Sequence, residues 1–372
     1  MRRIVHVVAF LLLAVTSCSI PVERPGSRPM PSPASDAATS VELAGRAAHT
    51  MTRLAGGDLL VAGGCTVDGC VEATASAYVL SGMAVSRVTD MAAARDAHTA
   101  VSLTDGRVLV VGGFAGEDQP PLESAEVFDP ASGRWTTTGA LDLGRGGHAA
   151  ALLGDGRVLV AGGWVGPSTY TDTTEIFDPA TGEFSPGPRL PQAADGLAAA
   201  SLSNGCALVV GGQIRSQVAT GRAATICPDG TVRRVASLGT ARFKHGVVAL
   251  DSGRVLVVGG TPNDAALLSS TEVYDPATRG FRPGPDMVSG RYKLTDSVIA
   301  LPGDRVVVAG GGQGVEVLDV DASRSSPIEA FDGGRRSFST IGVTDGRLVL
   351  VGGYDEDIRL TKTYASVRVA AL

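Results

Sequence analysis

Short apolar runs that end in two glycines recur along the whole chain of 372 residues. The clearest cover residues 107–113, 157–163, 254–260, 305–311 and 347–353, and looser versions cover 58–64 and 206–212. The seven Gly-Gly pairs begin at residues 63, 112, 162, 211, 259, 310 and 352, at intervals of 49, 50, 49, 48, 51 and 42 residues. A period near 50 predicts a propeller, because one small sheet cannot bury both of its faces without neighbours.

The second unit shows the internal pattern most clearly. Residues 98–103 and 107–111 are apolar strands joined by the tight turn Thr104-Asp105-Gly106. A variable loop, 114–124, leads to a third strand at 125–129 whose polar and apolar residues alternate. The turn 130–133 leads to a fourth strand, 134–140, which carries Trp135. Residues 175–184 and 272–281 repeat the second half of this unit.

These units resemble kelch repeats in the Gly-Gly pair after an apolar strand, the aromatic-Asp-Pro turn, and the later Trp or Phe. The resemblance covers Val41 to Leu372 and is closest in units two, three and five. It implies an all-β fold, a seven-bladed kelch-type β-propeller over residues 39–372. Only one strand, Thr363–Ala371, has room to follow Gly353. We therefore expect Ser40–Leu43 to supply the missing outer strand of the last blade and to close the ring.

The N-terminus has the pattern of an export signal. A positive start and a short apolar run precede Cys18, and the run is shorter than the ~20 residues of a membrane-spanning helix. Val15-Thr16-Ser17-Cys18 resembles the lipobox of bacterial lipoproteins, which implies a signal peptide at 1–17, lipidation of Cys18 and a membrane anchor. The alternative is an ordinary secretory peptide. Residues 18–38 are rich in Pro, Ser and Ala and predict an extended tether.

The resemblance to lipoproteins also bears on location. Ser19, after the lipidated position, implies sorting to the bacterial outer membrane and leaves open a periplasmic or surface-facing propeller. The net charge is -6 and the chain has no basic run, so we expect no nucleic-acid partner.

Four cysteines predict two disulfides. Arg and Asp occupy two fixed places in four units, as in Arg107 and Asp129, and Cys206 and Cys227 occupy the same places in the fourth unit. We infer that these places are neighbours across adjacent strands, linked by an ion pair or by a disulfide. Cys65 and Cys70 share one loop and are paired with each other. A metal site is the alternative, but the close Cys-x-x-Cys spacing typical of zinc is absent, so no metal is expected.

Cationic residues precede each Gly-Gly pair by seventeen positions, except in the fourth unit, which has Ala194. We predict that they ring the mouth of the central channel on the face of the variable loops and bind an anion: Arg46, Arg95, Arg145, Arg242, Lys293 and Arg335. The alternative is a framework role, in which each arginine bonds the backbone and the histidines three residues later pack between blades. Trp164 and Tyr354, from variable loops, complete the predicted ligand-binding set.

The sequence favours a binding module over an enzyme. We find no catalytic residues and no cofactor motif, and the variable loops predict recognition of a protein or a glycan. Two enzyme families with kelch-like propellers were weighed. Copper oxidases that resemble galactose oxidase need a Tyr–Cys cofactor and a histidine cluster, which we do not find. An enzyme similar to the sialic-acid epimerases stays open, and so does a purely structural role in the envelope.

Overall fold

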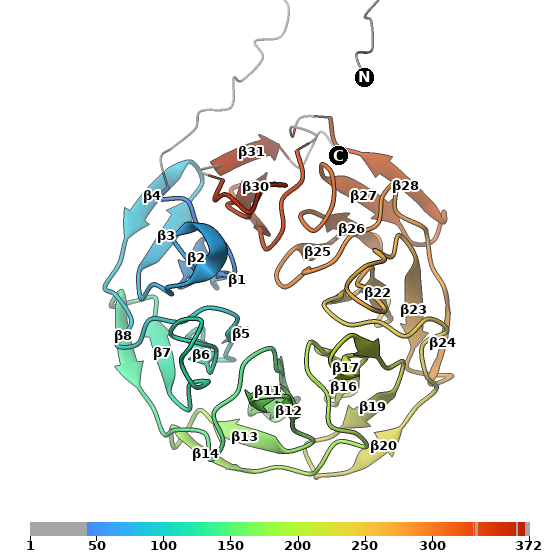
Figure 1. Cartoon of the computed structure of the whole chain (residues 1–372), viewed down its shortest axis with the longest axis horizontal. Coiled ribbons are helices and arrows are strands. Elements are labelled where there is room, and N and C mark those ends of the chain that lie inside the picture. The colour runs from blue at the N-terminus through green and yellow to red at the C-terminus, as the bar shows by residue number, and fades with distance from the viewer. Residues whose placement is uncertain (1–42, 330, 332–333, 362–363, 369–372) are drawn as a thin grey trace, which may run out of the picture. The chain divides into compact units, whose positions relative to one another are not determined.

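The computed structural model describes residues 43–329, 331, 334–361 and 364–368. Within them the chain forms seven antiparallel sheets arranged as the blades of a β-propeller (Figure 1). The predicted all-β, seven-bladed fold is therefore confirmed. The predicted signal peptide, Cys18 and the predicted tether lie outside the described residues. Among the described residues, no helix has the length and apolar character needed to cross a membrane.

The first four blades have four strands each. Blade 1 contains β1 (Thr50–Arg53), β2 (Leu59–Ala62), β3 (Ala77–Ser81) and β4 (Ala84–Arg87). Blade 2 contains β5 (Thr99–Ser102), β6 (Val108–Val111), β7 (Ala125–Asp129) and β8 (Arg134–Thr137). Blade 3 contains β9 (Ala149–Leu152), β10 (Val158–Ala161), β13 (Thr174–Asp178) and β14 (Glu183–Pro186). Blade 4 contains β15 (Ala198–Ser201), β16 (Ala207–Val210), β19 (Ala223–Ile226) and β20 (Val232–Arg234).

The remaining blades follow the same order. Blade 5 contains β21 (Gly246–Ala249), β22 (Val255–Val258), β23 (Thr271–Asp275) and β24 (Gly280–Pro283). Blade 6 contains β25 (Val298–Leu301), β26 (Arg305–Val308), β27 (Glu316–Asp319) and β28 (Arg324–Pro327). Blade 7 contains β29 (Thr340–Thr344), β30 (Arg347–Val351) and β31 (Tyr364–Arg368). The loops add two small hairpins, β11 (Trp164–Gly166) with β12 (Thr169–Tyr170) and β17 (Gln213–Arg215) with β18 (Val218–Ala219), and one 3-10 turn, η1 (Asp68–Cys70).

The second strand of each blade is apolar on both faces because neighbouring blades cover both. All four residues of β6 are fully buried. Seven separate apolar clusters fill the seven spaces between blades, and each draws on two adjacent sheets. The cluster between blades 7 and 1 joins Val349 and Val351 to Leu59 and Val61, and it includes Leu43. Leu43 is thus buried at the expected closure, whereas residues 40–42 of the predicted closing strand lie outside the described residues.

Each Gly-Gly pair is the point where one blade meets the next. Gly112 and Gly113 have φ values of 64° and 90°, in the left-handed region that glycine tolerates best. A Cβ atom added to Gly112 would lie 2.5 Å from the backbone oxygen of Arg145, in the next blade. The backbone nitrogen of Gly113 donates a hydrogen bond of 2.9 Å to that same oxygen. The glycines are therefore required by a close contact between blades.

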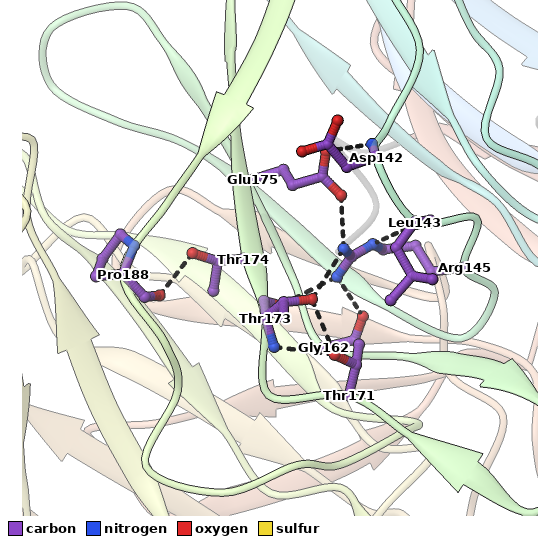
Figure 2. Close-up of polar contacts among 9 residues, drawn as sticks. All are labelled: Asp142, Leu143, Arg145, Gly162, Thr171, Thr173, Thr174, Glu175 and Pro188. Carbon is purple, nitrogen blue, oxygen red and sulfur yellow. Dashed lines mark hydrogen bonds and ion pairs between the residues drawn. The ribbon is translucent and has the colours of Figure 1, made fainter.

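A buried arginine accompanies this contact in most blades. Arg145 is fully buried and donates to the backbone oxygens of Gly162 and Thr173, each at 3.0 Å (Figure 2). Its guanidinium also pairs with the buried Glu175 at 2.7 Å. The same pairing recurs as Arg95–Glu126, Arg242–Glu272 and Arg291–Glu316, at 2.8–3.0 Å. The framework interpretation of the arginines is the one that agrees with this geometry.

Blade 4 lacks both partners of this pair. Ala194 replaces the arginine, and Ala224 takes the strand position that Glu175 holds in blade 3. A small cavity of about 30 Å³ borders both alanines. Both charges of this pair are absent together, so blade 4 is not left with one of them buried without its partner, which would be strongly destabilising.

The predicted disulfides are both present, as Cys65–Cys70 and Cys206–Cys227. The second joins the residue before β16 to the residue after β19, so the inferred neighbouring positions are confirmed. The proposed ion pair at the same place in blade 2 is wrong. Arg107 bonds Asp105, two residues away, and the backbone oxygen of Pro179 in blade 3. Asp129 instead accepts hydrogen bonds within its own turn, from Ala131 and Ser132.

We expect the buried pair of blade 3 to behave as a unit. Glu175→Ala leaves the Arg145 guanidinium buried without a counter-charge and should cost about 3–5 kcal/mol of unfolding free energy. Arg145→Ala should cost a similar amount, whereas the double variant should cost less than the sum of the two. Urea denaturation followed by circular dichroism measures all three. Glu183→Ala, at an exposed position of the same blade, is the matched control. Strict additivity of the two single effects would contradict this interpretation.

Candidate functional site

The predicted cation ring divides into two groups in the structure. Arg46, Arg95, Arg145 and Arg242 are at most 1% exposed and are bonded inside the blades, so they do not line a binding surface. Lys293 and Arg335 are partly exposed. The reason is a register difference in blades 6 and 7. In these blades Arg291 and Arg336 supply the backbone oxygens that bond the second glycine of the preceding blade. Lys293 and Arg335, which the seventeen-residue spacing selected, do not.

The mouth of the channel is lined by one residue from each blade, two positions after the buried arginine or its equivalent. We call these residues the mouth ring: Ala48, Ala97, Gly147, Gly196, Lys244, Lys293 and Phe338. All seven have φ between 46° and 62°. Backbone hydrogen bonds run from blade to blade around the ring, such as Ala97 to Ala48 at 3.2 Å and Lys293 to Lys244 at 2.7 Å. The ring fixes the backbone at the mouth and lets the side chains differ.

A cavity of about 550 Å³ opens at this mouth. The mouth ring forms its wall together with loop residues that follow the Gly-Gly pairs, among them Phe114 and Trp164. This volume suits a small molecule or the end of a larger one. The face of the variable loops, which the sequence indicated as the recognition surface, therefore holds a cavity over the channel.

One side of the cavity is cationic. The Lys293 ammonium lies 4.6 Å from the ring centre of Phe338 and 5.0 Å from that of Tyr292. Arg335 lies over the same Tyr292 ring, at 5.8 Å. In the described part of the chain, no carboxylate lies within ion-pair distance of Lys293 or Arg335. Lys244 differs, because it pairs with Asp264 at 2.7 Å. Lys293 and Arg335 are thus held by aromatic faces and leave their charge available.

Three acidic residues line the cavity, Asp96, Glu117 and Asp195, and two of them, Asp96 and Asp195, are the ones whose pKa is raised. Asp96 is 8% exposed, and burial raises the pKa of its carboxyl to about 7. Burial also raises the pKa of Asp195, although a hydrogen bond from Gln213 at 2.9 Å opposes the shift. Asp96 directly follows the buried Arg95, and Asp195 directly follows Ala194, the equivalent residue of blade 4. In the other blades the residue after the arginine is neutral. A carboxyl that titrates near neutral pH, as that of Asp96 does, can give or take a proton and so support acid–base chemistry.

Sequence reasoning missed Asp96, Asp195 and Lys244. The sequence does contain a signal for them. The arginine recurs, whereas the next two residues differ in chemistry from blade to blade. We assigned recognition to the recurring residue and not to its variable neighbours.

The two predicted aromatic residues have different roles. Trp164 lines the cavity, and its ring centre lies 5.4 Å from that of Phe114, so its role in ligand binding stays a prediction. Tyr354 is 5% exposed and lies outside the cavity wall, and its hydroxyl donates to the backbone oxygen of Val67 at 3.1 Å. Tyr354 therefore ties the loop of blade 7 to that of blade 1.

The histidines belong to the framework beneath the mouth. His49, His98 and His148 each share a hydrogen bond of 2.7–3.0 Å with a threonine of the neighbouring blade. Burial lowers the pKa of His148 and of His245 to about 3, so these rings are neutral. One group of possible metal ligands exists among the described residues, Cys65, Cys70 and Asp96, but the two thiols are joined in a disulfide.

The buried Asp96 carboxyl predicts a pH-dependent stability. Its pKa is about 7 in the folded chain and near 3.8 when unfolded. Between these values the folded state binds more protons, so stability falls as the pH rises and is lowest above 7. Asp96→Asn keeps the shape of the neutral acid. It should raise the melting temperature at pH 8, and the gain should shrink toward pH 4. Differential scanning fluorimetry at both pH values tests this, and a constant difference would contradict it.

Comparisons with known proteins agree with this architecture. A family model described as the kelch motif matches residues 97–139 and 145–191, which are the second and third blades. A search of curated proteins gives no match. A solved structure of YjhT superposes with a TM-score of 0.57 at 13% identity and covers 76% of this chain and 97% of its own, which shows a shared fold alone. The Gly-Gly repeats, the matched motifs and the seven blades together make this chain a kelch-repeat β-propeller.

Proposed function

We propose that this protein is an envelope-anchored binding module that recognises an acidic group of a protein or glycan at the mouth of its propeller. A kelch propeller is a generic interaction module, and the cavity on its loop face supports the proposal that it binds a ligand there. The observation that carries the proposal is the pair Lys293 and Arg335. Lys293 lines the cavity, Arg335 lies over the ring of Tyr292, the residue before Lys293, and neither cation has a carboxylate partner among the described residues.

The chemistry of the wall supports this ligand class. A carboxylate gains a charge-assisted hydrogen bond from Lys293 and can gain two from the planar guanidinium of Arg335. Phe114, Trp164 and Phe338 offer flat apolar faces for a sugar ring or an aromatic side chain. Tyr170, whose pKa is raised by burial and by nearby Asp195 and Asp264, adds a neutral hydroxyl beside the site.

An enzymatic role is the second candidate, because Asp96 and Asp195 place two carboxyls with raised pKa in one cavity. Such groups are what a carbohydrate-active enzyme, similar to the sialic-acid epimerases, requires for proton transfer. Proton NMR of sialic acid anomers incubated with the protein detects that activity. A purely structural role has no such support. The large apolar residues exposed in the described part, Val71, Leu143, Val288 and Ile358, lie on four separate segments.

Binding can be followed through Trp164. The chain has two tryptophans, and Trp135→Phe removes the one that packs on Phe128 at 5.0 Å, away from the cavity. Acidic peptides and acidic oligosaccharides should then shift the fluorescence of Trp164, whereas their amidated or neutral counterparts should not. The double variant Lys293→Ala/Arg335→Ala should weaken binding about tenfold or more, as loss of two charge-assisted bonds implies.

The control for this measurement is Arg324→Ala, an exposed arginine on the outermost strand of blade 6. It should leave the affinity unchanged. Higher salt should weaken binding of the acidic probes, because the interaction is between charges. Absence of any Trp164 response to both acidic sets, or equal binding by the double variant, would overturn the proposed site.

The anchor is a separate part of the proposal and rests on the sequence around Cys18. Cys18→Ser removes the thiol that would carry the lipid, and the protein should move from the membrane fraction to the soluble fraction. Metabolic labelling with a radioactive fatty acid should mark the parent chain and not the variant. Equal labelling of both chains would contradict lipidation at this residue and would leave the ligand-binding proposal unaffected.

A further inference from the structure

The Cys65–Cys70 disulfide lies in the wall of the mouth cavity. Cys65 is fully buried, whereas Cys70 is partly exposed and lines the cavity together with Gly69. Asp96 lines the same cavity, and one of its carboxylate oxygens lies within 4.8 Å of both sulfur atoms. A thiol that enters the cavity can therefore reach Cys70, and a carboxyl stands beside the sulfur that would leave.

The carboxyl of Asp96 has no structural use that would explain its burial. In the described part of the chain no group donates a hydrogen bond to it, whereas Asp195 accepts from Gln213 and Asp264 pairs with Lys244. In a mostly buried cavity wall without a hydrogen-bond donor, the ionised carboxyl is disfavoured by loss of solvation. The cost of burial is smallest when the carboxyl is protonated, so this position keeps a proton next to the two sulfurs.

We propose that Cys65–Cys70 is a reactive disulfide that exchanges with small dithiols entering the mouth cavity, and that Asp96 donates a proton to the departing sulfur of Cys65. This activity is independent of the acidic ligand proposed above. It rests on the exposure of Cys70, the burial of Cys65 and the placement of Asp96.

The exchange balances in two steps. The thiolate of the dithiol attacks Sγ of Cys70, a mixed disulfide forms, and the Cys65–Cys70 bond breaks. The electron pair goes to Sγ of Cys65, which takes the proton of the Asp96 carboxyl and leaves a carboxylate. The second thiol of the reductant then loses its proton to solvent and attacks the mixed disulfide, which frees Cys70 as a thiolate and releases the reductant as a cyclic disulfide. The protein gains two electrons, and the dithiol loses two.

Proton donation matters here because of where Cys65 lies. A thiolate formed at this buried position would lack solvation, and a poorly stabilised leaving group slows exchange. Cys206–Cys227 is an internal comparison in the same chain. It links two neighbouring strands of blade 4, and among the described residues no carboxylate approaches both of its sulfurs as Asp96 approaches the first pair.

Three other titratable groups near the disulfide, Tyr354, His49 and His98, keep their protonation state over the useful pH range. The pKa of Tyr354 is raised to about 12, chiefly by burial and then by Asp96 and Asp68, so it stays neutral. Burial lowers the pKa of His49 and His98 well below the usual range, so both stay uncharged above pH 6. Asp68, which accepts from the backbone nitrogen of Leu360, faces Tyr354 from η1. Asp96 is then the group that titrates beside the disulfide near pH 7.

The experiment measures the opening of both disulfides in the full-length protein. Dithiothreitol is the probe, acid stops the reaction, N-ethylmaleimide labels the free thiols, and mass spectrometry of peptides reports each pair. Cys65–Cys70 should open faster than Cys206–Cys227. Asp96→Asn should slow the first pair at least ~10-fold at pH 7, a modest figure for loss of a positioned proton donor, and should not change the second. Asp118→Asn, an exposed acid on the neighbouring loop, should change neither.

The pH profile separates proton donation from a structural effect. Divided by the concentration of dithiothreitol thiolate, the rate for Cys65–Cys70 should fall as the pH rises through 7 and should be flat in Asp96→Asn. If Asp96 acted only by loosening the fold when ionised, the rate would rise over that range. A rising or flat profile in the parent chain, or an unchanged rate in Asp96→Asn, would overturn the proposal.

Discussion

The contact between the second glycine of one blade and the backbone oxygen of the next is the constraint on which the propeller depends. It recurs at every blade junction, including the one where Gly353 donates to Arg46 and joins the last blade to the first. The residue that supplies the oxygen is an arginine in six blades, and five of those side chains are at most 1% exposed. A backbone bond therefore holds each junction together, a fully buried guanidinium accompanies five of the seven, and the apolar clusters fill the space between blades.

The seven junctions are alike, but the seven mouth positions are not. The framework uses its charges internally, where Arg–Glu pairs satisfy one another, and contributes little charge to the surface. Charge at the mouth comes from residues that interrupt the repeat, such as Lys293 and Asp96. A site formed in this way is asymmetric on a pseudo-symmetric scaffold. Recognition can then change by substitution at a few positions while the junctions stay the same.

Sequence periodicity predicted the fold because each blade must repeat the same packing. The seven blades and their buried second strands followed from the spacing of the Gly-Gly pairs. The disulfides followed from Cys206 and Cys227 at fixed places of the repeat and from the single loop that Cys65 and Cys70 share. The site was harder to predict, because recurrence marks framework more often than function. Arg95 and Arg145 recur since each fills a junction, and counting seventeen residues back selected Lys293 and Arg335 only because blades 6 and 7 differ in loop length. Solvent exposure distinguishes the buried framework arginines from Lys293 and Arg335. Exposure cannot be read directly from a single sequence.

The left-handed backbone of the mouth ring has a consequence for protein engineering. A β-carbon in this conformation costs about 1 kcal/mol, and the chain accepts that cost five times, at Ala48, Ala97, Lys244, Lys293 and Phe338. The blade-to-blade hydrogen bonds hold this geometry whatever side chain is present. The ring is thus a circle of seven attachment points with a preset direction. New specificities could be installed there one position at a time. Gly196 has room for a side chain, whereas a Cβ atom at Gly147 would collide with the carboxyl of Asp195.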